Sequence, residues 1–299
     1  MTDTLLIGMT GFGRSGGEAE WGSWTWEAKA VNGRGLDVRV NVPHGFEGLD
    51  QVVKAQAGSM FSRGNMQVSL RIEVSADTVV SVNEAALDGL CAAFKARTGK
   101  APQGDALATL MTSRAVLDGA GGSGNGLRQM GQDKDVHKAL LEGAVEALEQ
   151  LAMSRANEGS ALHLILSQAL DEMDRTRKEA EVVSAEQPVL LKERLSLKLQ
   201  EIAVEQELDS ERLAAEAAFA AAKADVREEL DRLEAHIETA RKHLAAGQTV
   251  GRKLDFLAQE LNREANTLCA KSASVPLTNA GLALKTLIDQ FKEQAANVE

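Results

Sequence analysis

The residues best suited to chemistry lie in the last third of the chain, where polar side chains recur at helical spacing. On a helix with about 100° per residue, residues 225–244 place four polar side chains on one narrow stripe: Asp225, Glu229, Arg232 and His236. An apolar seam runs beside this stripe, formed by Val226, Leu230, Leu233, Ile237 and Leu244. Because a stripe that borders such a seam is half-buried, we expect these polar groups to be held in place. Glu228, Asp231 and Glu234 point elsewhere and are weaker candidates.

Residues 252–271 show a second pattern of the same kind. Their packing face consists of Leu254, Leu257, Leu261 and Leu268. The opposite side carries Arg252, Asp255, Gln259, Asn262, Arg263 and Asn266, and one flank carries Glu260, Glu264 and Lys271. Asparagine and glutamine are weaker helix formers than the lysine and glutamate of a plain solvated face. Amides and arginines at these positions therefore indicate directional hydrogen bonding to a ligand.

Two kinds of site fit these residues. Carboxylates on adjacent helices can bind Mg²⁺ or Mn²⁺ through oxygen, and such a metal activates water against a phosphodiester. Arginine pairs with phosphate through two parallel hydrogen bonds, and His236 could be a metal ligand or a general acid. The alternative is a salt-bridge lattice between helices, which the pattern by itself favours.

The whole composition limits the classes of function. The chain has 299 residues, enough for two domains, and a net charge of −11, which argues against broad binding to a phosphate backbone. Aromatic residues make up only 3% and tyrosine is absent, so an aromatic base-stacking platform is not expected. Two distant cysteines favour a reducing compartment. Neither a membrane-spanning apolar run nor a secretory signal is found, so we expect a cytoplasmic protein.

The elements that must position these residues point to an α+β fold. Residues 36–42 and 67–74 alternate as half-buried strands do, and residues 43–61 between them suit a helix. Asn83 suits a helix N-cap, and Gly11-Phe12-Gly13 a structural turn. The composition predicts an N-terminal mixed α/β domain (1–118), a glycine-rich linker (119–126), a long-helix region (127–222) and a C-terminal helical domain (223–299). A group of basic residues in this region could form a basic face on the strands or simply a solvated surface, and the sequence favours neither: Arg14, Lys29, Arg34, Arg39, Arg63 and Arg71.

Several motifs resemble those of one known family. Met9-Thr10-Gly11-Phe12-Gly13-Arg14 and Val31-Asn32-Gly33-Arg34 are similar to the opening motifs of the YicC family. Arg155-x-x-Glu158-Gly159-x-x-Leu162 is similar to a middle element, and the runs from Glu228 to His236 and from Gly251 to Lys271 are similar to its C-terminal signatures. Asn65 departs from the lysine usual in the family at that position.

The resemblance implies a bacterial cytoplasmic endoribonuclease that cleaves single-stranded RNA with a divalent metal (Mg²⁺ or Mn²⁺). It also implies a ring-like homo-oligomer, a hexamer, with a role in small-RNA turnover. Carried onto this chain, the hypothesis makes Glu229, His236, Glu260 and Glu264 catalytic, and makes these four together with Asp255 the ligands of the metal. RNA would be bound by Arg34, Arg232, Arg252, Gln259, Asn262, Arg263, Asn266 and Lys271. The main rival is a noncatalytic oligomeric RNA-binding or adaptor protein, and a third possibility is a helical scaffold.

Overall fold

The computed structural model describes residues 6–74, 84–113, 116, 130–202, 210–247 and 250–299. They form two compact units: Met9–Arg155, here the sheet unit, and the residues up to Gly8 together with Ala156–Glu299, here the helical unit. The predicted linker 119–126 and the predicted cap Asn83 lie outside the described residues. The division between the units falls inside a helix, and the domain ranges drawn from composition remain predictions.

A four-stranded sheet organises the sheet unit. Its strands are β1 (Gly11–Ala19), β2 (Gly22–Val31), β3 (Leu36–Asn41) and β4 (Gly64–Val74), in the order β1-β2-β4-β3. The β1–β2 and β2–β4 pairs are antiparallel, whereas β3 runs parallel to β4 and is joined to it through α1 (Gly48–Met60). The unit also contains α2 (Glu84–Thr98) and α3 (Asp105–Met111). The α+β class and both alternating strands are confirmed.

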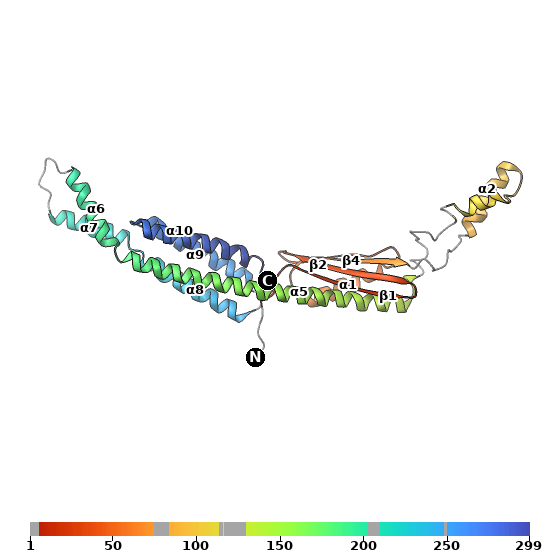
Figure 1. Ribbon diagram of the computed structural model, residues 1–299, viewed down its shortest axis with the longest axis horizontal. Helices are drawn as coiled ribbons and strands as arrows, with labels where there is room; N and C mark the ends of the chain where they lie inside the picture. The colour runs from red at the N-terminus through yellow and green to blue at the C-terminus, as the bar shows by residue number, and fades with distance from the viewer. Residues whose placement is uncertain (1–5, 75–83, 114–115, 117–129, 203–209, 248–249) are drawn as a thin grey trace. The chain divides into compact units, whose positions relative to one another are not determined.

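One face of the sheet packs against α1 and the first part of α5 (Lys134–Ser184), as Figure 1 shows. Trp26 is fully buried in this core, and its indole Nε1 donates a hydrogen bond of 2.8 Å to the backbone oxygen of Leu140. Alternate residues of the strands point away from the helices and are mostly exposed. The sheet therefore has one dry face and one solvent-facing side.

The turn predicted at Gly11-Phe12-Gly13 is wrong, because these residues begin strand β1. Glycine serves close packing here: a Cβ on Gly13 would lie 2.1 Å from the backbone oxygen of Ala147 on α5. Side chains of α5 also cover the outer edge of β1. The backbone N–H groups of Phe12 and Arg14 donate to Ser154 Oγ and Gln150 Oε1, both at 3.3 Å. These two hydrogen bonds block this part of the β1 edge from pairing with another chain.

The helical unit confirms the predicted long helices. After the second part of α5 come α6 (Gln187–Ile202), α7 (Ser210–Lys223), α8 (Arg227–Ala246), α9 (Gly251–Lys271) and α10 (Val275–Ala295). Figure 1 shows α9 and α10 side by side, and both contribute to one apolar core with α8 and α5. None of the helices in the described part of the chain has the length and apolar character that crossing a membrane requires.

The apolar seams predicted for α8 and α9 are buried. All five residues of the α8 seam and all four leucines of the α9 packing face belong to the core. The start of α9 is fixed by the end of the chain, since Val250 and Gly251 donate backbone hydrogen bonds of 3.0 and 3.2 Å to the Glu299 oxygen. A Cβ on Gly251 would lie 2.2 Å from the backbone oxygen of Val298, so glycine allows this close approach. These contacts set the position of α9 against its neighbours.

Candidate active site

Ion pairs between α8 and α9 bring the predicted catalytic residues together. Lys271 Nζ donates to Glu229 Oε1 at 2.8 Å, and Arg232 Nη1 donates to Glu264 Oε1 at 3.5 Å. Because the earlier residue on α8 meets the later residue on α9, the two helices run antiparallel here. We call these four residues the α8–α9 ladder. The predicted stripe on α8 and the predicted flank on α9 therefore face each other.

Both acids of the ladder are buried, which sets them apart from a solvated lattice. The side chains of Glu229 and Glu264 keep only 5% and 7% of their surface exposed. Burying a carboxylate is unfavourable unless it is paired and hydrogen-bonded. Glu229 Oε1 meets this condition through Lys271, but Glu229 Oε2 is buried and has no hydrogen-bond partner within the described structure. This oxygen keeps its full capacity to accept a proton or a hydrogen bond.

The cations of the ladder are more accessible than its acids. The side chain of Arg232 is 54% exposed and also binds Glu228, which lies on the surface of α8. An exposed ion pair of this kind contributes about 0–1 kcal/mol, so a phosphate oxygen could replace Glu228 at little cost. Lys271 is 30% exposed and additionally donates to the backbone oxygen of Asp225 at 3.1 Å. The ladder therefore presents positive groups outward and carboxylates inward.

His236 and Glu260 continue the ladder by register. The pairing of residue 232 with residue 264 places His236 opposite Glu260, about one turn further along each helix. Both are half-buried, and no hydrogen bond or ion pair joins them among the described residues. They lie on the predicted side of their helices, but their assigned roles remain predictions.

The amides of α9 form a separate hydrogen-bonded row on its outer side. Gln259 Nε2 donates to Asp255 Oδ2 at 2.9 Å, Asn266 Nδ2 to Asn262 Oδ1 at 2.8 Å, and Asn262 Nδ2 to Asp289 Oδ1 on α10 at 3.0 Å. Gln259 and Asn262 thus donate to carboxylates, whereas Asn266 donates to another amide. The predicted roles of the three amides, binding RNA or orienting the acids of the site, remain predictions.

Exposed groups on the same side of α9 are available to a ligand. Arg252 and Arg263 are exposed and form no ion pair within the described structure. Phe256 between them is 59% exposed. Phe256 belongs to the C-terminal run that resembles the YicC family, but no role was predicted for it, because aromatic residues make up only 3% of the chain. Its helical spacing from Arg252 and Arg263 can be read from the sequence.

The predicted metal ligands are not gathered into one site by this chain. Glu229 and Glu264 each use an oxygen for a cation, and Asp255 lies on the side of α9 that faces α10. Across the described residues, no group of three or more histidine, cysteine or acidic side chains is arranged to hold an ion. The residues present in one chain therefore do not fit a complete divalent-metal site, and we derive no step through a metal.

Asp225 differs from its predicted place on the stripe. It precedes α8, and its carboxylate binds Arg227 through the guanidinium, at 2.7 Å for the shortest contact, and through the backbone N–H at 3.0 Å. These hydrogen bonds lower the pKa of Asp225 to about 2. Its backbone oxygen, rather than its carboxylate, contacts Lys271. Asp225 therefore holds the start of α8 and the end of α9 together.

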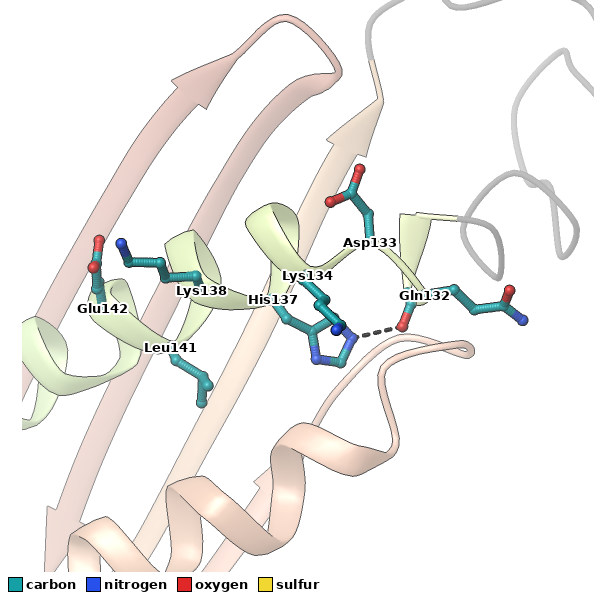
Figure 2. A pocket seen from close by; sticks show the side chains of 8 residues that line it. Gln132, Asp133, Lys134, His137, Lys138, Leu141 and Glu142 are labelled. Carbon is teal, nitrogen blue, oxygen red and sulfur yellow. Dashed lines mark hydrogen bonds between the residues drawn. The ribbon is translucent and has the colours of Figure 1, made fainter.

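The sheet unit contains two further places where polar residues could bind a ligand. Arg34 is exposed in the connection between β2 and β3. A shallow hollow at the start of α5 contains His137, whose Nε2 lies 2.6 Å from the backbone oxygen of Gly131 (Figure 2). Asp133 beside it accepts the backbone N–H of Asp135 at 2.9 Å. Because these groups satisfy the local backbone, the hollow has the character of a helix start rather than a reactive site.

Comparison with known proteins agrees with the resemblance seen in the motifs. Residues 6–164 match the family described as "Endoribonuclease YicC-like, N-terminal region", and residues 177–299 match "Endoribonuclease YicC-like, C-terminal". A relative from Haemophilus influenzae, named "Probable endoribonuclease YicC", is 31% identical over 99% of this chain and 100% of its own length. A protein of the same name from Clostridioides difficile is 26% identical over the same shares of the two chains. The chain belongs to the YicC-like endoribonuclease family.

Proposed function

We propose that this protein is an endoribonuclease that cleaves single-stranded RNA at the α8–α9 ladder. The names of the family and of both relatives support the reaction class. The observation that carries the location is the buried Glu229 carboxylate, with one oxygen held by Lys271 and the other without a partner. A base fixed at one oxygen and free at the other is oriented for proton transfer.

The exposed cations would bind the substrate backbone. Arg232 exchanges Glu228 for a phosphate oxygen, while Arg252 and Arg263 contact neighbouring phosphates through bidentate hydrogen bonds. Lys271 stabilises negative charge that develops on the phosphorus oxygens. Gln259, Asn262 and Asn266 bind RNA groups or keep orienting the acids of the outer row.

The acids and the histidine would move protons. Glu229 Oε2 accepts the proton of the attacking hydroxyl or water, and His236 donates a proton to the leaving oxygen. Glu264 positions Arg232, and Glu260, which lies opposite His236 by register, would accept a hydrogen bond from the imidazole only in the substrate-bound state. Because Glu229 Oε2 is buried, a small movement at the start of α8 must accompany substrate binding.

The proposal includes dependence on Mg²⁺ or Mn²⁺, assembly into a homo-oligomer that is a hexamer, a cytoplasmic location and a role in small-RNA turnover. A bound divalent metal would supply charge neutralisation and water activation near the scissile phosphate. Since one chain does not gather its ligands, we expect RNA phosphates or a second copy of the chain to complete the coordination.

The rival function, a noncatalytic RNA-binding or adaptor protein, is favoured by one specific observation. Both basic members of the ladder already neutralise acids of the same chain, as a purely structural lattice would require. In that case the ladder stabilises the packing of α8 on α9 and takes no part in chemistry.

Cleavage of end-labelled single-stranded RNA by the purified full chain separates these functions. The reaction is run with Mg²⁺, with Mn²⁺ and with EDTA, on the parent and on Glu229→Gln, His236→Ala and Glu264→Gln. Asp231→Asn is the matched control, because Asp231 is an exposed acid of α8 outside the ladder. We expect a rate loss of about 10²–10⁴-fold for Glu229→Gln and an unchanged rate for the control.

Each outcome has a distinct meaning. RNA binding without cleavage by the parent protein would favour the adaptor. Cleavage that continues undiminished in EDTA would refute the metal dependence alone. Equal activity of parent and Glu229→Gln, with both folded by circular dichroism, would remove the ladder from the reaction.

A further inference from the structure

The solvent-facing side of the β-sheet is a continuous surface that the proposed reaction at α8–α9 does not use. Alternate residues from each strand point to it, and all of these side chains are exposed or half-buried. The central part of this surface, here the open sheet face, consists of Phe12, Arg14, Thr25, Glu27, Lys29, Arg39, Asn41, Gln67, Ser69 and Arg71.

The strand register places one row of these side chains straight across all four strands. Phe12 lies opposite Lys29, Lys29 opposite Gln67, and Gln67 opposite Arg39. With neighbouring strands about 4.8 Å apart, the row is about 14 Å long. Phe12 is 46% exposed, and Lys29 Nζ lies 5.6 Å from the centre of its ring. An exposed aromatic ring next to cations and an amide is the composition of a single-strand binding surface.

The charges of the open sheet face favour a polyanion. Lys29 pairs with Glu27 at 3.2 Å, and Arg39 pairs with Asp37 at 3.3 Å. The two remaining cations, Arg14 and Arg71, are exposed and form no ion pair among the residues that the structure describes. The open sheet face therefore carries four cations and one acid, Glu27, while three further acids, Asp37, Glu18 and Glu73, lie at the ends of the strands on the same side of the sheet. Positive charge is thus concentrated in the middle of the sheet, although the whole chain has a net charge of −11.

A small hollow lies beside one of these free arginines. It is lined by Thr25, Glu27, Ser69, Leu70 and Arg71. The hydroxyl and carboxylate groups at its rim can bind the 2′-hydroxyl or a base edge, while the guanidinium can bind a phosphate. The hollow thus adds hydrogen-bonding groups to the charge and the aromatic ring.

We propose that the open sheet face binds a single-stranded segment of RNA, separately from the cleavage residues on α8 and α9. Phe12 stacks on one base, Arg14 and Arg71 bind phosphates, and Gln67 hydrogen-bonds a base edge. The choice of RNA as ligand rests on the proposed function. The low aromatic content led us to expect no aromatic base-stacking platform, and the proposal departs from that expectation at one position, the exposed ring of Phe12 beside Lys29.

Binding of 5′-fluorescein oligouridylate to the full-length protein, followed by anisotropy in EDTA, tests this surface. Gel analysis of the oligonucleotide after each titration shows that it stays intact. Phe12→Ala should weaken binding about tenfold, since stacking contributes about 1–3 kcal/mol per base. Arg14→Ala and Arg71→Ala should each lower the slope of log K against log salt by about 0.7.

Matched controls come from the helical unit. Phe219→Ala removes another exposed phenylalanine, 59% exposed, with Lys223 Nζ 4.5 Å from its ring centre. Arg175→Ala removes an exposed arginine of α5. Both should bind within twofold of the parent protein. Equal binding by Phe12→Ala and the parent, or unchanged salt slopes for both arginine variants, would overturn the proposal.

Cleavage of the same RNA, measured in parallel with metal present, keeps the two proposals apart. If the parent does not cleave but Phe12→Ala loses affinity, the open sheet face binds RNA and the endoribonuclease proposal fails. If the parent cleaves and Phe12→Ala binds normally, the reverse holds. Displacement by polyglutamate as effective as by unlabelled oligouridylate would show a general anion surface and overturn the choice of RNA.

Discussion

Replacing Lys271 by methionine should destabilise the helical unit more than any other single change in the α8–α9 ladder. Lys271 Nζ supplies the 2.8 Å hydrogen bond to Glu229 Oε1 and the 3.1 Å hydrogen bond to the Asp225 oxygen. Without it, the Glu229 carboxylate, whose side chain is only 5% exposed, loses the one hydrogen-bond partner that it has within the described part of the chain.

The expected magnitude follows from the burial of the two partners. Removing one member of a fully buried ion pair costs about 3–5 kcal/mol. The Lys271 side chain is 30% exposed, so water can partly replace it, and we expect a loss of about 2–3 kcal/mol in the free energy of unfolding. For a cooperative unit of this size, 1 kcal/mol corresponds to about 2–4 °C, so the melting temperature should fall by about 4–12 °C.

A double-mutant cycle with Glu229→Gln measures the interaction itself. Glutamine keeps an oxygen that can accept a hydrogen bond from Lys271 but carries no charge, so Glu229→Gln should lower the free energy of unfolding by about 1 kcal/mol. In the double variant no buried charge is left unpaired, so the combined loss should be smaller than the sum by at least about 1 kcal/mol. Urea unfolding followed by circular dichroism gives all four values. A loss below about 0.5 kcal/mol for Lys271→Met, or additive losses, would refute the assignment of a buried, constrained Glu229.

Three further outcomes are expected. Gly251→Ala should lower the free energy of unfolding by about 1–3 kcal/mol, because the new Cβ would lie 2.2 Å from the backbone oxygen of Val298; thermal unfolding checks this. The pKa of Asp225 is lowered to about 2 from the ordinary value of 3.8, so its pairing with Arg227 stabilises the fold above pH 3.8 and is lost as the pH falls toward 2. Arg227→Ala should therefore lower the free energy of unfolding only slightly at neutral pH, since the pair is exposed, and this difference should vanish below pH 2 in acid-titrated urea unfolding. Arg177→Met should lower the free energy of unfolding by less than Lys271→Met does. Two of the three acids that Arg177 binds are at least 53% exposed, so water can solvate them after the change. The same urea unfolding assay measures both variants.

Local periodicity was sufficient to predict much of the fold. Residues 36–41 and 67–74 alternate in sequence and lie in β3 and β4, because a strand with one wet face needs an apolar side chain at every second position. The leucine seams of α8 and α9 could also be predicted, because a helix that packs on a core needs apolar side chains at every third or fourth position. The turn predicted at Gly11-Phe12-Gly13 was wrong because these glycines allow β1 to pack closely against α5. That contact joins residues far apart in the sequence, so the local pattern of residues does not show it.

For the candidate site, the sequence by itself determined which faces of residues 225–271 are apolar and which are polar. Only the tertiary structure decided the pairs between helices: Glu229 with Lys271, Arg232 with Glu264, and Asn262 with Asp289 on α10. Periodicity fixes the angle of a side chain around its own helix, whereas the register between two helices depends on how their leucines interlock and where the chain between them turns. Glu229, which the sequence suggested as a metal ligand, therefore lies beside Lys271 when α8 and α9 pack together.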